Sequence, residues 1–179
     1  VDYVLMGAGI PRSIPGNIDR LTEHLEVRQT AHVEGATNED RFEVVFDPRK
    51  VFPEPPAKLK RPRFLAIVAS NVLATTLVRK SNGRVDGFVV EGPTAGGHNA
   101  PTRTKGLTND RGEPLYGERD VVDLEDIKAL GLPFWLAGSF GESGKVKEAL
   151  AWGATGVQVG TAFAYARESG LAKWIREKI

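Results

Sequence analysis

The sequence of 179 residues contains no cysteine and only three histidines. Disulfide bonds, thiolate nucleophiles and cysteine-based metal centres are therefore excluded, and a metal site would need histidine and carboxylate ligands. His98 and Glu91 are close in sequence, but two ligands without a third do not make a metal site. We expect no bound metal.

Excess charge and long hydrophobic runs are also scarce. The formal net charge is +1, so nucleic acid is not an expected partner. No apolar run approaches the roughly 20 residues of a membrane helix, and the opening VDYVLMGAG lacks the basic start of a signal peptide. We expect a cytoplasmic protein without a membrane partner. Because Val1 already stands inside an apolar run, we also expect further sequence upstream.

Five short apolar runs organise the chain. Each is nearly continuous rather than alternating, which is typical of strands buried on both faces. Most end in glycine or serine. The runs are YVLMGAG (3–9), FLAIVAS (64–70), DGFVVEG (86–92), PFWLAGS (133–139) and TGVQVGT (155–161).

Apolar residues at helical spacing follow each of these runs. The pattern predicts a helix over 14–25 with Pro15 in its first turn, and another over 72–80. A helix over 124–130 would be capped by Asp123 and stopped by Gly131, and one over 146–150 capped by Ser143 and stopped by Gly153. The last residues, LAKWIREKI, predict a further amphipathic helix.

The repeat of buried strand, glycine and helix predicts an α/β fold with a parallel sheet. Two architectures fit, an open doubly wound sheet and a (β/α)8 TIM barrel. No GxGxxG or P-loop motif is present. A complete barrel has eight βα units in about 250 residues, so the five units found here would form an incomplete one.

Two segments interrupt the repeat. Residues 26–62 contain two β-like stretches, 27–33 and 42–46, around a polar turn, and predict a β-hairpin-like insertion. Residues 93–120 form a long loop after the third strand. Structureless loops of this length in a compact domain are functional or disordered as a rule, so we interpret 93–120 as an active-site loop.

Candidate phosphate-binding residues end the fourth and fifth strands. They are Ala137-Gly138-Ser139 and Gly160-Thr161. Glycine lets a phosphate approach the backbone, where N–H groups and a helix N-terminus favour its charge. In barrels a phosphate commonly lies between the last two strand ends. Tight βα turns without a ligand are the alternative interpretation.

His98 follows Gly96-Gly97 at the end of the third run. Histidine titrates near neutral pH and is the usual general acid or base. A loop histidine that only caps backbone groups is the alternative. Of the aromatic residues, Trp135 is expected in the core, and Tyr116 either walls a pocket or anchors the surface.

His24 and His32 receive no functional interpretation. Acidic residues of the long loop are interpreted as a solvated face. They are Asp110, Glu113, Glu118 and Asp120.

Three strings together resemble the nitronate monooxygenase (2-nitropropane dioxygenase-like) family: VVEGPTAGGH, LPFWLAGSFG and EALAWGATGVQVGTAFAYARESG. VDYVLMGAGIP resembles the family's fourth strand and turn. The resemblance covers the chain apart from 26–62 and implies an FMN-dependent TIM barrel of which strands four to eight are present. Two departures are Ser139, where the family commonly has glycine, and Asn99, where it often has arginine.

The resemblance also implies roles. His98 would be the catalytic residue, taking the proton α to a nitro group or contacting the nitronate. Gly96 and Gly97 would lie against the flavin, and Ala137, Gly138, Ser139, Gly160 and Thr161 would surround the FMN phosphate. The implied reaction is oxidation of alkyl nitronates, with a small-molecule substrate and O2 as partners.

Two alternatives stay open at this point. The same motifs resemble FMN-dependent enoyl-acyl carrier protein reductases, which use NAD(P)H. The chain could also be a catalytically silent barrel fragment, because an unclosed sheet leaves edges that associate with a copy of itself or with another chain.

Overall fold

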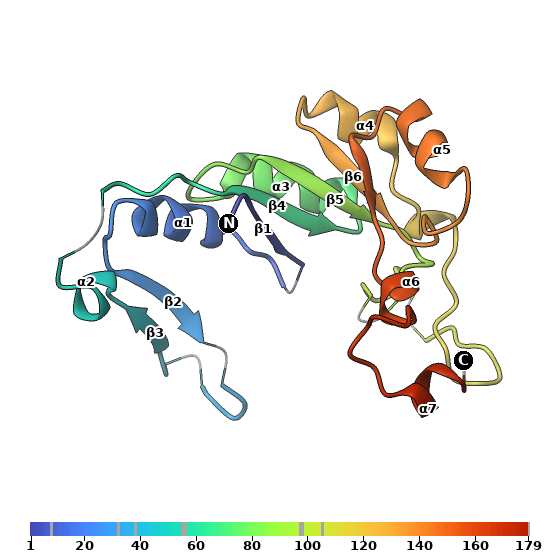
Figure 1. Cartoon of the computed structure of the whole chain (residues 1–179), viewed down its shortest axis with the longest axis horizontal. Coiled ribbons are helices and arrows are strands. Elements are labelled where there is room, and N and C mark those ends of the chain that lie inside the picture. Colours follow the sequence, from blue (N-terminus) through green and yellow to red (C-terminus); the bar gives the residue numbers. More distant parts are fainter. Residues whose placement is uncertain are drawn as a thin grey trace. The chain divides into compact units, whose positions relative to one another are not determined.

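The computed structural model describes residues 1–7, 9–31, 33–37, 39–54, 57–96, 99–104 and 106–178 (Figure 1). In this part of the chain, one sheet has five strands in the order β1-β4-β5-β6-β7. A doubly wound sheet would reverse its strand order at a switch point, whereas these strands follow chain order. Their bounds are β1 Tyr3–Met6, β4 Arg63–Val68, β5 Gly87–Glu91, β6 Phe134–Ala137 and β7 Gly156–Gln158.

A helix follows every strand of this sheet before the next strand begins, which confirms the predicted α/β repeat. The helices are α1 Ile14–Thr22, α2 Pro48–Val51, α3 Asn71–Lys80, α4 Leu124–Ala129, α5 Lys145–Ala151, α6 Thr161–Ala164 and α7 Lys173–Arg176, with a 3-10 turn, η1, at Glu118–Asp120. In the described residues, no helix is long and apolar enough to cross a membrane.

The chain divides into two compact units. The first comprises Val1–Leu65 and Thr76–Asp86, and the second comprises Ala66–Thr75 and Gly87–Ile179. The boundary falls within β4 and within α3, so the chain passes between the units three times.

The second unit is built around β5, β6 and β7, which pair in parallel. Phe88 lies opposite Phe134 and Glu91 opposite Ala137, while Ala137 also lies opposite Gln158. The first four residues of β5 are buried, as the continuous apolar run predicted. Further core side chains in this unit are Leu136, Ile127 and Ala149.

Helix ends in the second unit follow the predicted signals with exceptions. Asp123 caps α4 by accepting hydrogen bonds from the N–H groups of Glu125 and Asp126, and Gly131 and Gly153 adopt left-handed φ values of 70° and 86° where α4 and α5 stop. The predicted Ser143 cap is wrong.

Gly144 occupies the N-cap position of α5, with φ 85° and no side-chain bond. The predicted C-terminal helix shortens to the single turn of α7, whose Trp174 is 63% exposed.

The first unit contains the hairpin-like pair predicted within 26–62. β2 (Val27–Ala31) and β3 (Phe42–Phe46) are antiparallel, with Val27 opposite Phe46 and Ala31 opposite Phe42. All five residues of β3 are exposed. That 26–62 is an insertion relative to the family stays a prediction. In α1, Pro15 lies in the first turn as expected, but the helix ends at Thr22, before Leu25.

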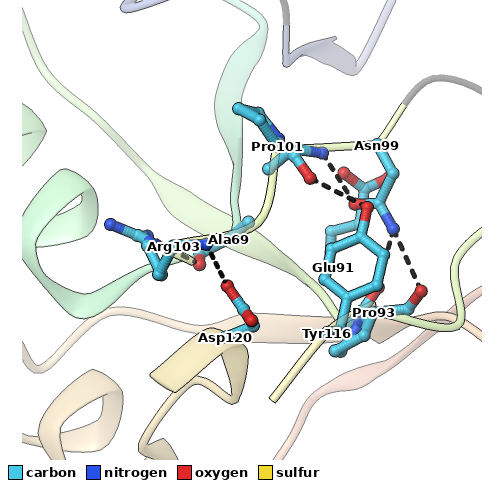
Figure 2. A pocket seen from close by; sticks show the side chains of 10 residues that line it. Ala69, Glu91, Pro93, Asn99, Pro101, Arg103, Tyr116 and Asp120 are labelled. Atoms are coloured by element: carbon cyan, nitrogen blue, oxygen red, sulfur yellow. Dashed lines mark hydrogen bonds between the residues drawn. The ribbon is translucent and has the colours of Figure 1, made fainter. Parts of the chain in front are cut away.

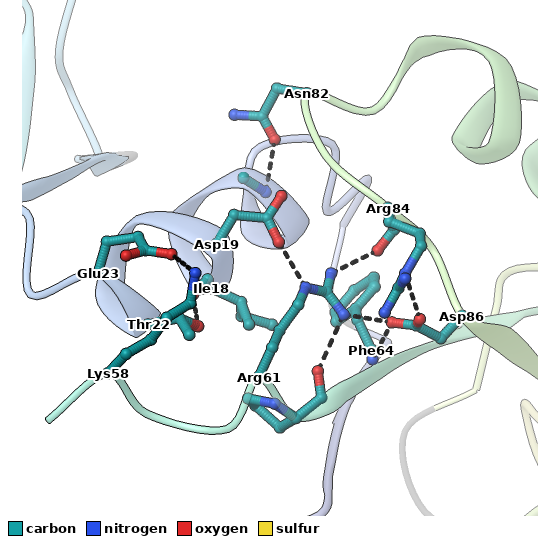
Figure 3. A network of polar contacts seen from close by, with 12 residues as sticks. Ile18, Asp19, Thr22, Glu23, Lys58, Arg61, Phe64, Asn82, Arg84 and Asp86 are labelled. Atoms are coloured by element: carbon teal, nitrogen blue, oxygen red, sulfur yellow. Dashed lines mark hydrogen bonds and ion pairs between the residues drawn. The ribbon is translucent and has the colours of Figure 1, made fainter.

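A polar network fastens three segments of the first unit (Figure 3). The Arg61 guanidinium contacts the carboxylates of Asp19 and Asp86 and donates to the carbonyl of Arg84 at 2.7 Å. The Asp86 carboxylate also accepts from the N–H of Phe64 at 2.8 Å. Burial would raise the pKa of Asp86, but the Phe64 N–H and the Arg61 charge outweigh it and lower that pKa.

The expected burial fails in both edge strands of the sheet and at Trp135, and the residues of β7 are only half-buried. Tyr3 and Leu5 of β1 are 41% and 45% exposed, because β1 is an edge strand of the sheet in this chain. Trp135 is half-buried rather than core. Its ring lies where a Cβ on Gly156 would come within 3.0 Å, so it packs along the neighbouring strand β7.

Candidate functional site

The carboxyl ends of β5, β6 and β7 share one groove in the second unit. Its volume is about 530 Å³. Ligands bind at this end of the strands in parallel α/β folds. The predicted site residues that line the groove are Gly96, Ala137, Gly138, Ser139, Gly160 and Thr161. The other two, Gly97 and His98, lie outside the described residues.

The turn after β6 is shaped by two unusual backbone conformations. Gly138 has φ +100°, and a Cβ there would lie 2.9 Å from the backbone nitrogen of Ala95. Ser139 follows with φ 58°, a left-handed conformation that costs a non-glycine residue about 1–2 kcal/mol. Strain of this kind concentrates at functional sites. Gly138 therefore lets the loop after β5 close over the end of β6, and Ser139 is held in place at a cost.

A second close approach joins the loop after β5 to the residues after β7. A Cβ on Gly96 would come within 2.6 Å of Thr161 Oγ1. Gly96 therefore leaves room for the Thr161 hydroxyl, and the three strand ends form one continuous surface.

Gly160 differs from these two glycines. Its φ is −113° and its ψ −61°, which other residues can adopt, and a Cβ there would meet no atom within 4 Å. Neither backbone strain nor packing explains glycine here. Space left in front of a backbone is what a closely approaching ligand requires, so Gly160 fits the predicted phosphate contact.

The polar groups of the groove determine how a phosphate could be held there. Glu91 and Glu142 line it, whereas no lysine or arginine does so among the described lining residues. A phosphate would be held by backbone N–H groups and by the Ser139 and Thr161 hydroxyls, which are sufficient donors. The predicted helix-dipole contribution is small, because α6 is a single turn and α5 begins only at Lys145.

Sequence reasoning missed several lining residues, three of which bring an amide or an aromatic side chain. Gln158 ends β7 and brings a side-chain amide to the groove, while Phe140 and Tyr165 bring aromatic rings. The Phe140 ring packs edge-on against Trp152 with centroids 6.3 Å apart. The signal for Gln158 was available, because it is the only polar side chain between Gly156 and Gly160.

Side-chain hydrogen bonds hold the base of the long loop (Figure 2). The Asn99 amide donates to the carbonyls of Gly92 and Pro93 at 3.3 and 3.2 Å. The Tyr116 hydroxyl donates to the carbonyl of Ala100 at 2.9 Å, which makes it an anchor. Only about 10 Å³ is left among these side chains, roughly the space of one water molecule. The residues that flank 97–98, Gly96 and Asn99, thus have defined contacts.

Asp120 corrects the interpretation of the acidic residues as a solvated face. Its side chain is buried, with the residue 8% exposed. Its two carboxylate oxygens accept from the N–H groups of Arg103 at 2.7 Å and Gly117 at 2.8 Å. These bonds, Gly117 first, lower the pKa of Asp120. The Arg103 side chain in turn donates to the carbonyl of Ala69, the residue after β4, at 3.3 Å. Through Arg103, Asp120 therefore connects the long loop to the end of β4.

The tip of the loop has structure of its own. Thr108 and Pro114 form an isolated antiparallel bridge, and the Asn109 side chain accepts from the N–H groups of Arg111 and Glu113 at 2.9 Å each. The tip of the predicted long loop therefore has local order of its own. An active-site role for 93–120 stays a prediction.

Comparison with known proteins connects this groove to a family. A family model described as nitronate monooxygenase matches residues 28–179. The chain belongs to the nitronate monooxygenase family. The match includes 28–62, most of the predicted insertion, and leaves the VDYVLMGAGIP segment outside it.

A similar curated protein is a probable nitronate monooxygenase from Staphylococcus haemolyticus, 25% identical over 115 residues, which cover 64% of this chain and 31% of that protein. Two solved structures of FabK from Thermotoga maritima are similar in fold. The M276A mutant aligns over 99% of this chain and 41% of its own, with 22% identity and a TM-score of 0.56. The second aligns with 21% identity, a TM-score of 0.51 and 39% coverage of its own chain.

These matches confirm the fold class predicted from the sequence. The five parallel strands and their helices form an incomplete TIM barrel. The chain spans 31% of the length of the curated relative and about two fifths of the FabK chains. The family match and the structural matches thus agree on the fold.

Proposed function

We propose that this protein is an FMN-dependent oxidoreductase that oxidises alkyl nitronates with O2. The observation that carries the proposal is the groove at the carboxyl ends of β5, β6 and β7, where Gly160 leaves space in front of the backbone and Ser139 and Thr161 bring hydroxyl groups. The family resemblance suggests FMN as the ligand, because its phosphate would fit the space in front of this backbone. Its partners would be a small nitro compound and O2.

Each described residue would have a limited task. Ser139 and Thr161, with the backbone after β6 and β7, would hold the phosphate, and Gly96 would leave room for the flavin. FMN, when bound, would supply the electron chemistry of the oxidation. The protein's contribution would be binding, orientation and exclusion of water. The aromatic rings of Phe140 and Tyr165 would provide the apolar part of that enclosure.

His98, by its resemblance to the family's histidine, would take the proton α to the nitro group. Asn99 supports this role, because its hydrogen bonds to Gly92 and Pro93 fix the chain directly after His98. A nitronate has already lost this proton. His98→Asn should therefore slow turnover of a neutral nitroalkane by about 10²–10⁴-fold and leave turnover of the matching nitronate much less affected. Equal losses with both substrates would remove His98 from the base role.

Anaerobic stopped-flow measurements on the FMN-loaded protein test the reaction. Bleaching of the flavin by an alkyl nitronate, and slow bleaching by NADH or NADPH, is the expected result. Rapid bleaching by NAD(P)H alone would instead favour the enoyl-reductase alternative. If the protein takes up no FMN, the groove lacks its proposed cofactor. That result would favour the alternative of a catalytically silent barrel fragment.

A further inference from the structure

We propose that β3 is an interaction surface for a second copy of this chain, in which the two β3 strands pair antiparallel along their free edges. β3 belongs to the two-stranded sheet of the first unit and has only β2 as a strand partner in the part of the chain that the structure describes (Figure 1). A two-stranded sheet is marginally stable in water, and further strands with an apolar face stabilise it. The surface is separate from the groove of the second unit and does not depend on the proposed reaction.

The apolar face of β3 is left uncovered in the single chain. Val27 of β2 is 9% exposed, whereas Phe46, which lies opposite Val27, is 44% exposed. Phe42 and Val44, on the same face of β3 as Phe46, are 45% and 63% exposed. Burial by the rest of the first unit therefore reaches Val27 and leaves all three side chains of β3 exposed.

β3 also lacks the features that protect a free edge strand from association. Such features include a β-bulge, a proline or a lysine within the strand. The pairing with β2 is continuous over five residues, without a bulge, and the sequence FEVVF contains neither proline nor lysine. Its single charged residue, Glu43, contacts Arg28 of β2 at 3.4 Å. Because its charge is already partnered, Glu43 does not guard the free edge.

The sequence around β3 indicates a second copy as the partner, because RFEVVFD (41–47) is complementary to itself. Antiparallel pairing centred on Val44 places Phe42 opposite Phe46 of the other copy, and Arg41 opposite its Asp47. Asp47 continues the extended backbone, with φ −113° and ψ 109°. Aromatic pairs and opposite charges that face each other stabilise neighbouring strands. One pairing thus satisfies the apolar face and both charged ends.

The same charges select this pairing over others. An in-register parallel pair would place Arg41 opposite Arg41, and like charges in that position are destabilising. In the antiparallel pair, Glu43 lies opposite Val45 rather than opposite a second carboxylate. Asp47 caps α2 through Oδ1, which accepts from the N–H of Arg49 at 3.1 Å, and no described residue bonds to its Oδ2. Since each β3 has one free edge, the pairing closes as a symmetric dimer and does not extend into a fibre.

Sedimentation velocity of the whole protein over a series of concentrations tests the pairing. A single strand pair is smaller than a standard interface, so we expect a weak dimer with a dissociation constant between about 1 µM and 1 mM. Val44→Lys and Val44→Glu each place like charges opposite each other, and each should weaken the dimer about fivefold or more. An equimolar mixture of the two variants should restore association, because opposite charges then face each other.

Matched variants separate this surface from others. Arg41→Glu opposes Asp47 with a like charge and should weaken the dimer, whereas Arg111→Glu, at the tip of the long loop, should not. Leu5→Lys, on the edge strand β1 of the main sheet, should also leave it unchanged. Circular dichroism checks that each variant is folded.

Four results would overturn the proposal. Wild type could remain monomeric up to about 1 mM, or a dimer could persist unchanged in Val44→Lys. The mixture of the two Val44 variants could fail to associate more strongly than either variant alone. A dimer that Leu5→Lys dissociates would assign the association to the edge of the main sheet instead.

Discussion

Removing the Arg61 guanidinium should destabilise the first unit strongly. The Arg61 side chain is 16% exposed and that of Asp86 is 10% exposed, so their contact lies largely out of water. Removing one partner of a buried ion pair costs about 3–5 kcal/mol. Asp86 would keep the Phe64 N–H and the contact with Arg84. We therefore expect Arg61→Met to cost near the lower limit, about 3 kcal/mol.

Arg84 provides a matched control at the same carboxylate. It contacts Asp86 at 2.7 Å, but its side chain is 70% exposed, and exposed ion pairs contribute at most about 1 kcal/mol. Urea unfolding should show Arg61→Met far less stable than Arg84→Met, with a fall in melting temperature of about 6–12 °C for Arg61→Met. A double-mutant cycle with Asp86→Asn isolates the pair.

The same pair predicts the dependence on pH. Because the folded-state pKa of Asp86 is lowered, its stabilisation is fully present above the ordinary aspartate pKa of about 3.9 and is lost as the pH falls through the lowered value. The stability gap between wild type and Arg61→Met should therefore narrow in acid. A loss below about 1 kcal/mol, typical of exposed pairs, or a gap that does not change with pH, would refute the buried-pair reasoning.

Two further predictions concern the second unit. Gly138→Ala should destabilise the protein by about 1–3 kcal/mol, because φ is +100° and the new Cβ meets Ala95; unchanged urea unfolding would contradict this. Asp120→Asn should free the base of the long loop, because an amide accepts through only one oxygen and cannot retain both N–H bonds, to Arg103 and Gly117. Hydrogen exchange at those two amides should become faster, and the pH at which they lose protection in wild type should lie below the ordinary aspartate pKa, since that pKa is lowered.

The general course of the fold could be predicted because its signals are local. The near-continuous apolar run at 86–92 becomes β5, with Phe88, Val89 and Val90 buried. Asp123, Gly131 and Gly153 mark helix ends through bonds made within a few residues. Strand ends rich in glycine also predicted which residues would share the groove.

The features that could not be predicted depend mainly on contacts between residues that are distant in sequence. Asp120 is buried because its carboxylate meets the N–H of Arg103, 17 positions away, and nothing in the local pattern indicates that partner. Ser139 adopts a left-handed conformation that its residue type disfavours. Trp135 is half-buried, with its ring against Gly156 of the neighbouring strand β7. His24 combines a left-handed backbone conformation with a buried nitrogen, Nε2, that has no partner among the described residues, and its residue type indicates neither.

The assignment of the groove to FMN is tested most directly by comparing FMN with riboflavin, which lacks the phosphate. Gly160→Asn and Gly160→Asp both place a favourable N-cap residue at the start of α6, and a Cβ at this position meets no atom within 4 Å, so we expect both variants to fold like wild type. Hydrogen bonds to a charged group contribute about 1.5–3 kcal/mol each.

We predict that wild type binds FMN at least about tenfold more tightly than riboflavin. Gly160→Asp should lose that preference through repulsion of the phosphate, and Gly160→Asn should keep more of it. Titration by flavin fluorescence would contradict the central claim if wild type took up no flavin, or if Gly160→Asp preferred FMN as strongly as wild type does.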